Sequence, residues 1–323
     1  MSRLTLQRIM VRMLFDPAYA TRVVEQPRDA LAGEDLTEEE RSWLGRPDPR
    51  AWRTDPERPL RTLTVLLQEF PAAAALVVAA AGAEPLRAFF ASPGFHKVIT
   101  RRGSAAMAFG DYLVELASGE SIGDPRIAPL ALLEAAIARL RRSYRGDEWA
   151  AGNAEPHEDR SEERRKDWIT GGTSAGTDAG HRGLYVRSDD LALHEAPAGT
   201  ADLHDALRAL LNAEGPELAR LVLAPPADLP DARIDPGGRE FLLLERAFAD
   251  GLPWRCPIGI SEVTPEFWSL LSFAATPRPM ESLVAEAERL GAAADEAPEI
   301  VGGLVEDGLL IETRSADEGI RRA

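Results

Sequence analysis

The sequence is poor in cysteine and histidine, and this scarcity argues against two kinds of stabilising site. A single cysteine, Cys256, in 323 residues rules out an internal disulfide framework. The five histidines are His96, His157, His181, His194 and His204. None of them stands four residues from another histidine or from the cysteine, which is the spacing of a metal site on a helix. We therefore expect no structural metal and no bound cofactor in this chain.

Basic side chains and long apolar runs are also scarce. The chain has 37 Lys and Arg against 53 Asp and Glu, which gives a net charge of −16. Such a field repels nucleic acid and anionic membranes and favours a basic partner. The most apolar run, residues 71–82, is about half the length needed to cross a bilayer, so it predicts a buried Ala-rich helix. We expect no nucleic-acid partner and no membrane span.

The N-terminus lacks the small-residue cleavage site that follows a signal peptide, which predicts a cytoplasmic chain. The length of 323 residues suggests two domains.

Residues 1–145 carry helical signals throughout. One stripe of apolar residues consists of Leu6, Ile9, Met10, Met13 and Leu14. Thr37 and Glu40 have the spacing of a capping box. We expect an all-α helical bundle here.

The second half of the chain has a different pattern. Residues 146–182 mix charge, Gly, Ser and Thr without an apolar period and are interpreted as a linker or mobile loop. Residues 183–323 predict an α+β domain of winged-helix type. Its expected strands are 184–187, 191–196, 220–225, 240–248 and 309–313, and a helix at 201–213 is inserted among them. Its other expected helices lie within 264–274, 278–291 and 295–308.

Candidate chemical groups each have two interpretations. His157 with Glu158 or Asp159 could hold a metal, but adjacent polar residues of a loop are more often solvated. His96 lies among phenylalanines, which favours a core-edge imidazole over a general base. Cys256 follows Arg255, which could lower a thiol pKa, but no base is identifiable and a packed thiol is favoured.

Neither a phosphate-binding Gly-rich loop nor a nucleophile elbow is present in the sequence. We therefore expect no catalytic residues and interpret the chain as a protein other than an enzyme.

The charge of the expected winged helix argues against DNA as its ligand. Residues 261–311 contain ten acidic and two basic side chains, a balance of 2 − 10 = −8. A DNA reader gains most of its non-specific affinity from Lys and Arg. Such a domain can instead bind an extended peptide along a strand edge beside a helix. We expect that edge at residues 239–248 and that helix at residues 295–305.

Two segments resemble known families. Residues 264–312, "TPEFWSLLSFAATPRPMESLVAEAERLGAAADEAPEIVGGLVEDGLLIE", resemble the PqqD-like recognition element of pathways that modify ribosomally made peptides. Residues 14–51, with 66–72 and 86–113, look like the helical partner subunits of multinuclear non-heme iron-dependent oxidases. The resemblance implies a non-catalytic subunit that binds the leader of a precursor peptide and presents its core to the oxidase. The iron would belong to that partner enzyme.

The resemblance also implies candidate binding residues. The peptide groove would contain Phe241, Leu243, Ile300 and Leu304. A docking surface for the oxidase would lie in an aromatic cluster that consists of Phe89, Phe90, Phe95, Phe109 and Tyr112. For this cluster the core interpretation is favoured, because aromatic residues at helical spacing usually pack inward.

Two other functions compete with this one. The first is a transcription regulator that uses the winged helix on DNA, against which the local charge of −8 argues. The second is a stand-alone metalloenzyme with a metal held by His157, Glu158 and a distant histidine.

Overall fold

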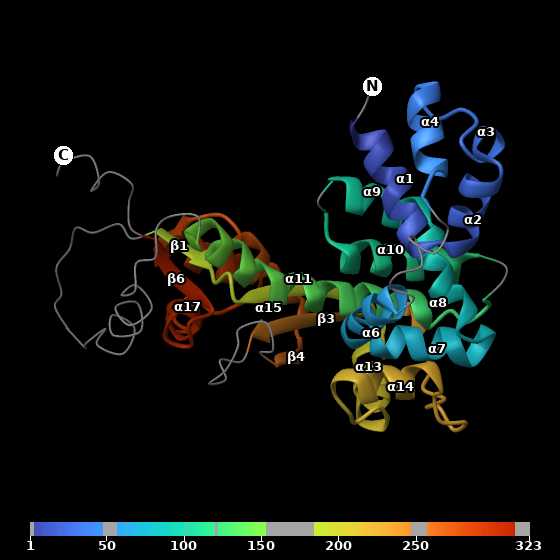
Figure 1. The fold of residues 1–323 in the computed structure, drawn as a ribbon. Helices are drawn as coiled ribbons and strands as arrows, with labels where there is room; N and C mark the ends of the chain where they lie inside the picture. Colours follow the sequence, from blue (N-terminus) through green and yellow to red (C-terminus); the bar gives the residue numbers. More distant parts are fainter. Residues whose placement is uncertain are drawn as a thin grey trace, which may run out of the picture. The chain divides into compact units, whose positions relative to one another are not determined.

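The computed structural model describes residues 3–47, 57–101, 103–119, 122–152, 184–246 and 257–313. The chain divides into two compact units, each made of two segments (Figure 1). Unit 1 consists of Met1–Ala138 and Ala196–Arg239, and unit 2 consists of Arg139–Glu195 and Glu240–Ala323. Together the units contain helices and two small sheets, which is an α+β composition.

The described part of residues 1–145 contains helices and no strand, as the sequence predicts. These helices are α1 (Arg3–Phe15), α2 (Pro17–Glu25), α3 (Pro27–Ala30), α4 (Glu38–Gly45), α6 (Arg58–Glu69), α7 (Pro71–Ala81), α8 (Glu84–Ala88), the 3₁₀ turn η1 (Phe89–Ala91), α9 (Pro93–Arg101), α10 (Ala105–Ser118) and α11 (Ile127–Gly152). Because α11 continues to Gly152, the first residues of the expected linker 146–182 are helical. Residues 153–183 lie outside the described part of the chain.

Side-chain caps set the starts of the early helices. Thr37 accepts a hydrogen bond from the Glu40 N–H (3.2 Å), and the Glu40 carboxylate accepts one from the Thr37 N–H (2.8 Å). The expected capping box at the start of α4 is thus confirmed. Asp16 caps α2 by accepting from the Tyr19 N–H at 2.9 Å. The polypeptide therefore resumes a helix directly after α1 ends.

The Ala-rich run forms α7 at the centre of unit 1. Residues 72–77 are at most 1 % exposed, which confirms the expected buried helix. Among the residues that the structure describes, no single helix is long and apolar enough to cross a membrane. Helices α6 and α7 together have the length and composition of a span, but the chain bends by 115° between them.

Two helices from the second half of the chain complete the core of unit 1. They are α13 (Thr200–Leu210) and α14 (Gly215–Leu223), which pack on α6 and α7 (Figure 1). The strand expected at residues 220–225 is wrong, because residues 220–223 belong to α14. Leu218, Ala219 and Val222 lie on one helical stripe that is buried in this core. A short apolar run does not distinguish a strand from a buried helix.

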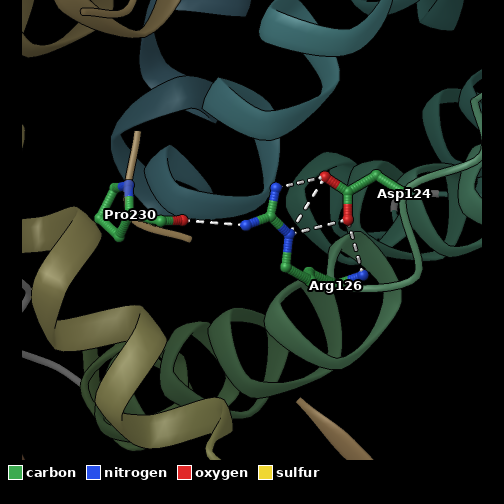
Figure 2. A network of polar contacts seen from close by, with 3 residues as sticks. All are labelled: Asp124, Arg126 and Pro230. Atoms are coloured by element: carbon green, nitrogen blue, oxygen red, sulfur yellow. Dashed lines mark hydrogen bonds and ion pairs between the residues drawn. The ribbon is translucent and has the colours of Figure 1, made fainter. Parts of the chain in front are cut away.

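An arginine joins the start of α11 to the loop after α14. The Arg126 guanidinium donates to both carboxylate oxygens of Asp124, with its nearest contact at 2.8 Å, and to the carbonyl oxygen of Pro230 at 2.9 Å (Figure 2). Burial acts to raise the pKa of the Asp124 carboxyl, but the hydrogen bonds from Arg126 and its charge together outweigh this effect and hold the pKa below its usual value. This network ties together residues that are far apart in the sequence of unit 1.

The strands within the described residues form two three-stranded sheets. They are β1 (Leu184–Arg187), β2 (Leu191–Ala198), β3 (Asp235–Arg246), β4 (Ile258–Val263), β5 (Arg278–Pro279) and β6 (Leu310–Thr313). One sheet has the order β5-β1-β6, with β1 antiparallel to both neighbours. The other has the order β2-β3-β4, with β3 antiparallel to β4. Strands β1, β2, β3 and β6 coincide with expected strands, whereas β4 and β5 were not expected.

Three helices cover the core of unit 2. They are α15 (Pro265–Phe273), α16 (Met280–Arg289) and α17 (Ala297–Glu306), and all three were expected. Helix α16 packs on α15 and α17, and α17 packs on β6. The buried residues include Leu271, Leu283, Val301 and Leu310. The helices bury one apolar stripe each, which is why their sequence period identifies them.

A buried arginine connects three segments of unit 2. Arg246, at the end of β3, is 4 % exposed and forms an ion pair with Asp190. Its guanidinium also donates to the Leu140 carbonyl and to the Ser143 hydroxyl, the latter at 2.9 Å. These bonds join the end of β3 to the middle of α11 and to the turn between β1 and β2. A buried arginine with several acceptors is a strong structural constraint.

Candidate functional site

The four expected groove residues lie in unit 2, but they do not share one exposed surface. Leu243 is 7 % exposed and Leu304 is 4 % exposed, and both belong to the apolar core. Phe241 is partly buried beside Trp268, with ring centroids 5.5 Å apart. Ile300, on α17, is 40 % exposed. Ile300 and Phe241 are therefore the two of these residues that offer surface to a ligand.

The strand edge expected at residues 239–248 is wrong. These residues lie largely in β3, which is the central strand between β2 and β4 and has neighbours on both sides. A central strand has no free backbone groups for a peptide to join. The central position of β3 was not predicted because residues 258–263, which form β4, gave no strand signal. Without β4, one side of β3 was expected to have no neighbouring strand.

Strand β6 of unit 2 does lie at the edge of a sheet and beside a helix. Strand β6 is the end strand of the sheet β5-β1-β6, and its registered partner within the described residues is β1. Helix α17 packs directly on β6 and carries the exposed Ile300. A strand edge beside a helix is the arrangement that an extended peptide joins in β-augmentation.

Helix α17 also has unusual open space on its surface. Gly302 and Gly303 lie in the middle of the helix, where each Gly costs about 1 kcal/mol relative to Ala. A Cβ atom built on either glycine would meet no heavy atom within 4 Å. Packing in the described part of the chain thus gives no reason for these two glycines, and the surface above them is open.

Every charged side chain in the segment that contains α17 and β6 is acidic. Residues 295–313 contain six acidic side chains and no Lys or Arg: Asp295, Glu296, Glu299, Glu306, Asp307 and Glu312. All six are exposed, and none forms a salt bridge within the described part of the chain. Carboxylates that lack a cationic partner attract basic ligands and repel phosphate.

The expected docking cluster lies in the core of unit 1. Phe89, Phe95 and Phe109 are fully buried, and Phe90 is 4 % exposed. The four rings contact one another as edge-on or tilted pairs with centroids 5.0–5.6 Å apart. Tyr112 is partly buried, and its hydroxyl donates to the Pro85 carbonyl at 2.7 Å. The four phenylalanines thus present no exposed surface to a partner, which agrees with the core interpretation.

Unit 1 contains two buried polar side chains, Glu134 and His204, that were not predicted from the sequence. Glu134, on α11, is 1 % exposed and accepts hydrogen bonds from the N–H groups of Ala72 (2.8 Å) and Ala73 (3.1 Å) at the start of α7. His204 Nε2 lies 4.0 Å from Glu134 Oε1, and His204 Nδ1 lies 3.4 Å from the Asp205 carboxylate. Burial raises the pKa of the Glu134 carboxyl, while His204 and the two backbone bonds act in the opposite direction.

A signal for Glu134 is present in the sequence. It is the lone charged residue in the apolar stretch Ile127–Ala138 of α11, and such a residue usually has a buried partner. Its contacts identify a structural function, because it satisfies two backbone donors at a helix N-terminus that have no partner inside the helix.

Other candidate groups give no assembled chemical site. His96 is 8 % exposed, and burial followed by the charge of Arg12 lowers its pKa, as expected for a core-edge imidazole. In the described ranges, no group of three or more His, Cys, Asp or Glu could hold a metal ion. The candidates His157, Glu158 and Cys256 lie outside the described residues.

Comparison with known proteins adds no relative. No protein-family model matches the chain, and no curated protein is significantly similar to it.

Proposed function

We propose that this chain is a non-catalytic subunit that binds the leader of a ribosomally made precursor peptide and presents the peptide to a separate iron-dependent oxidase. The observation that carries the proposal is the outer edge of β6, which no strand of the described residues occupies, beside α17 with its exposed Ile300. A peptide added to this edge would gain affinity from backbone hydrogen bonds, and contacts with the helix would select its side chains.

The order of elements in unit 2 supports a winged-helix type of domain. Helix α15, strand β5, helices α16 and α17, and strand β6 follow one another along the chain. Strand β1, from an earlier segment, supplies the third strand of the sheet. In this proposal Leu304 and Leu243 belong to the core beneath the site, while Ile300 contacts the peptide.

The charge favours a peptide over a nucleic acid as the ligand. The six carboxylates of residues 295–313 would face the phosphates of a DNA duplex and oppose its binding. A peptide that joins β6 through backbone hydrogen bonds does not require basic side chains on this surface. The proposed oxidase would supply the iron and the oxidation chemistry, and this chain would supply binding and orientation.

Co-expression with an oxidase-like protein encoded beside this chain tests the proposal. The readouts are co-elution of the two proteins and the iron content of the pair and of each protein alone. We expect the pair to co-elute, iron to accompany the oxidase, and a labelled precursor peptide to bind this chain with micromolar or tighter affinity. The Ile300→Ser variant should weaken peptide binding, because it removes the apolar contact, and should change the thermal unfolding of the chain little, because the Ile300 side chain is 40 % exposed.

Three results would contradict the proposal. A chain that elutes alone and binds no precursor peptide has neither of the expected partners. Iron that remains with this chain when it is purified alone would favour the metalloenzyme. Duplex binding in a gel-shift assay that weakens steeply with salt would favour a transcription regulator.

A further inference from the structure

One face of α17 combines an exposed apolar side chain, a glycine and two carboxylates. Glu296, Ile300, Gly303 and Asp307 are spaced by four, three and four residues, which places them on one stripe of the helix. We call these four residues the α17 stripe. Glu296 and Asp307 are the residues that flank the helix, and both have right-handed helical backbone angles, so the stripe continues through both ends.

The stripe has no partner in the described part of the chain. Ile300 is 40 % exposed, and a Cβ atom on Gly303 would meet nothing within 4 Å. Glu296 and Asp307 are exposed and form no ion pair with described residues. The α17 stripe thus has an apolar side chain between two unpaired carboxylates, and there is room above Gly303. A ligand segment with an apolar residue between two cations is complementary to this arrangement.

The length of the stripe fixes the spacing of those ligand residues. Along a helix that rises 1.5 Å per residue, Glu296 and Ile300 are about 6 Å apart, and Ile300 and Asp307 are about 10 Å apart. An extended peptide advances about 3.3 Å per residue, so it covers these distances in about two and about three residues. The first cation and the apolar residue are two positions apart and lie on the same face of an extended peptide. The second cation lies three positions further on and points to the opposite face, so its long, flexible side chain has to reach around the peptide to Asp307.

We propose that the α17 stripe selects a basic segment of the bound peptide, in extended conformation, with the pattern cation, one residue, apolar residue, two residues, cation. This inference rests on the proposed function and specifies the chemistry of the ligand at the same site. The apolar residue contacts Ile300 above Gly303, and the two cations pair with Glu296 and Asp307. The absence of Lys and Arg from residues 295–313 leaves these carboxylates available for such a ligand.

A designed probe tests the pattern without knowledge of the natural precursor. The probe is a fluorescein-labelled, Thr-rich synthetic peptide that carries Lys, Leu and Lys at the predicted spacing, and its twin carries Glu in place of both Lys. Fluorescence anisotropy with the full chain should give at least about tenfold tighter binding of the Lys probe, which is about 1.4 kcal/mol. The double variant Glu296→Lys/Asp307→Lys should reverse this preference.

The matched control changes the same net charge elsewhere in unit 2. Glu262 on β4 and Glu288 on α16 are exposed, and the double variant Glu262→Lys/Glu288→Lys should keep the preference for the Lys probe. Thermal unfolding followed by circular dichroism verifies that both double variants fold. A preference that is equal in the two double variants would overturn the inference, because it would reflect net charge alone. Equal binding of the two probes to the unmodified chain would also overturn it.

The result separates this inference from the proposed function. If the chain co-elutes with the oxidase and binds the precursor, but does not distinguish the two probes, only the ligand pattern is wrong. If it distinguishes the probes but forms no complex with the oxidase and binds no precursor, the proposed function is wrong and the stripe is a basic-peptide site of another kind.

Discussion

Glu134 links two helices of unit 1 through the backbone of one of them. Its carboxylate replaces the cap that α7 lacks in its own sequence, since Phe70 precedes the helix and provides no side-chain oxygen. The positive end of the α7 dipole and two N–H donors compensate the cost of burying this acid. Glu134 is thus present in the apolar part of α11 because the start of α7 needs an acceptor for its N–H groups.

We predict that Glu134→Gln lowers the free energy of unfolding of unit 1 by about 1–3 kcal/mol. Glutamine keeps one acceptor oxygen, but its amide NH₂ would face the N–H of Ala72 or Ala73 and leave that donor unsatisfied. Urea unfolding followed by circular dichroism measures the change. Glu115→Gln on α10 is the control, because Glu115 is exposed and its replacement should have little effect. Equal stability of the two variants would show that Glu134 does not support α7.

Helix α10 lies close to the Phe70 ring, at the junction of α6 and α7, where it carries a glycine. A Cβ atom on Gly110 of α10 would lie 2.8 Å from Cε1 and 3.0 Å from Cζ of Phe70, which precedes α7. Phe70 is fully buried and has no room to move away without a shift of its neighbours. The glycines of α17 differ, because the space beside them is open.

Two Gly→Ala substitutions should therefore have opposite effects. Gly110→Ala should destabilise the chain by about 1–3 kcal/mol, because overpacking exceeds the gain in helix propensity. Gly302→Ala should stabilise it by about 0.5–1 kcal/mol, because the added methyl group meets no atom and the helix gains propensity. Differential scanning calorimetry of both variants measures the two signs. Stabilisation by Gly110→Ala would mean that α10 and Phe70 lie farther apart than described.

At the scale of the whole molecule, each unit has its own apolar core. Leu67 is fully buried in the main core of unit 1, and Leu283 is fully buried in the core of unit 2. The division between the units passes through α11, β2 and β3, so each of these elements contributes residues to both. Separate cores allow separate opening of the two units.

We predict that Leu283→Ala increases hydrogen exchange mainly in unit 2. Removing a buried Leu side chain costs about 2–5 kcal/mol through lost burial and the cavity that remains. Exchange measured by mass spectrometry should rise in α15, α16 and α17 and stay nearly constant in α6 and α7. Leu67→Ala is the reciprocal control and should affect α6 and α7 most. Equal increases in both units for either variant would indicate a single cooperative unit.

Local sequence patterns were sufficient to predict the elements that bury one regular stripe and have clear boundaries. The all-α composition of residues 1–145, the capping box at Thr37, the buried Ala-rich helix and the last three helices were predicted from local patterns. Strands β1, β2, β3 and β6 were predicted in the same way. These features depend on residues within a few positions of one another, so their signals are visible without the fold.

Which segments become neighbours could be seen only in the folded chain. It showed that residues 220–223 are helical because they complete the core around α6 and α7, and that β4 makes β3 a central strand. It placed Glu134 at the start of α7, Leu304 in the core and Ile300 at the surface. Burial and pairing depend on contacts between residues far apart in the chain, and no local pattern determines them.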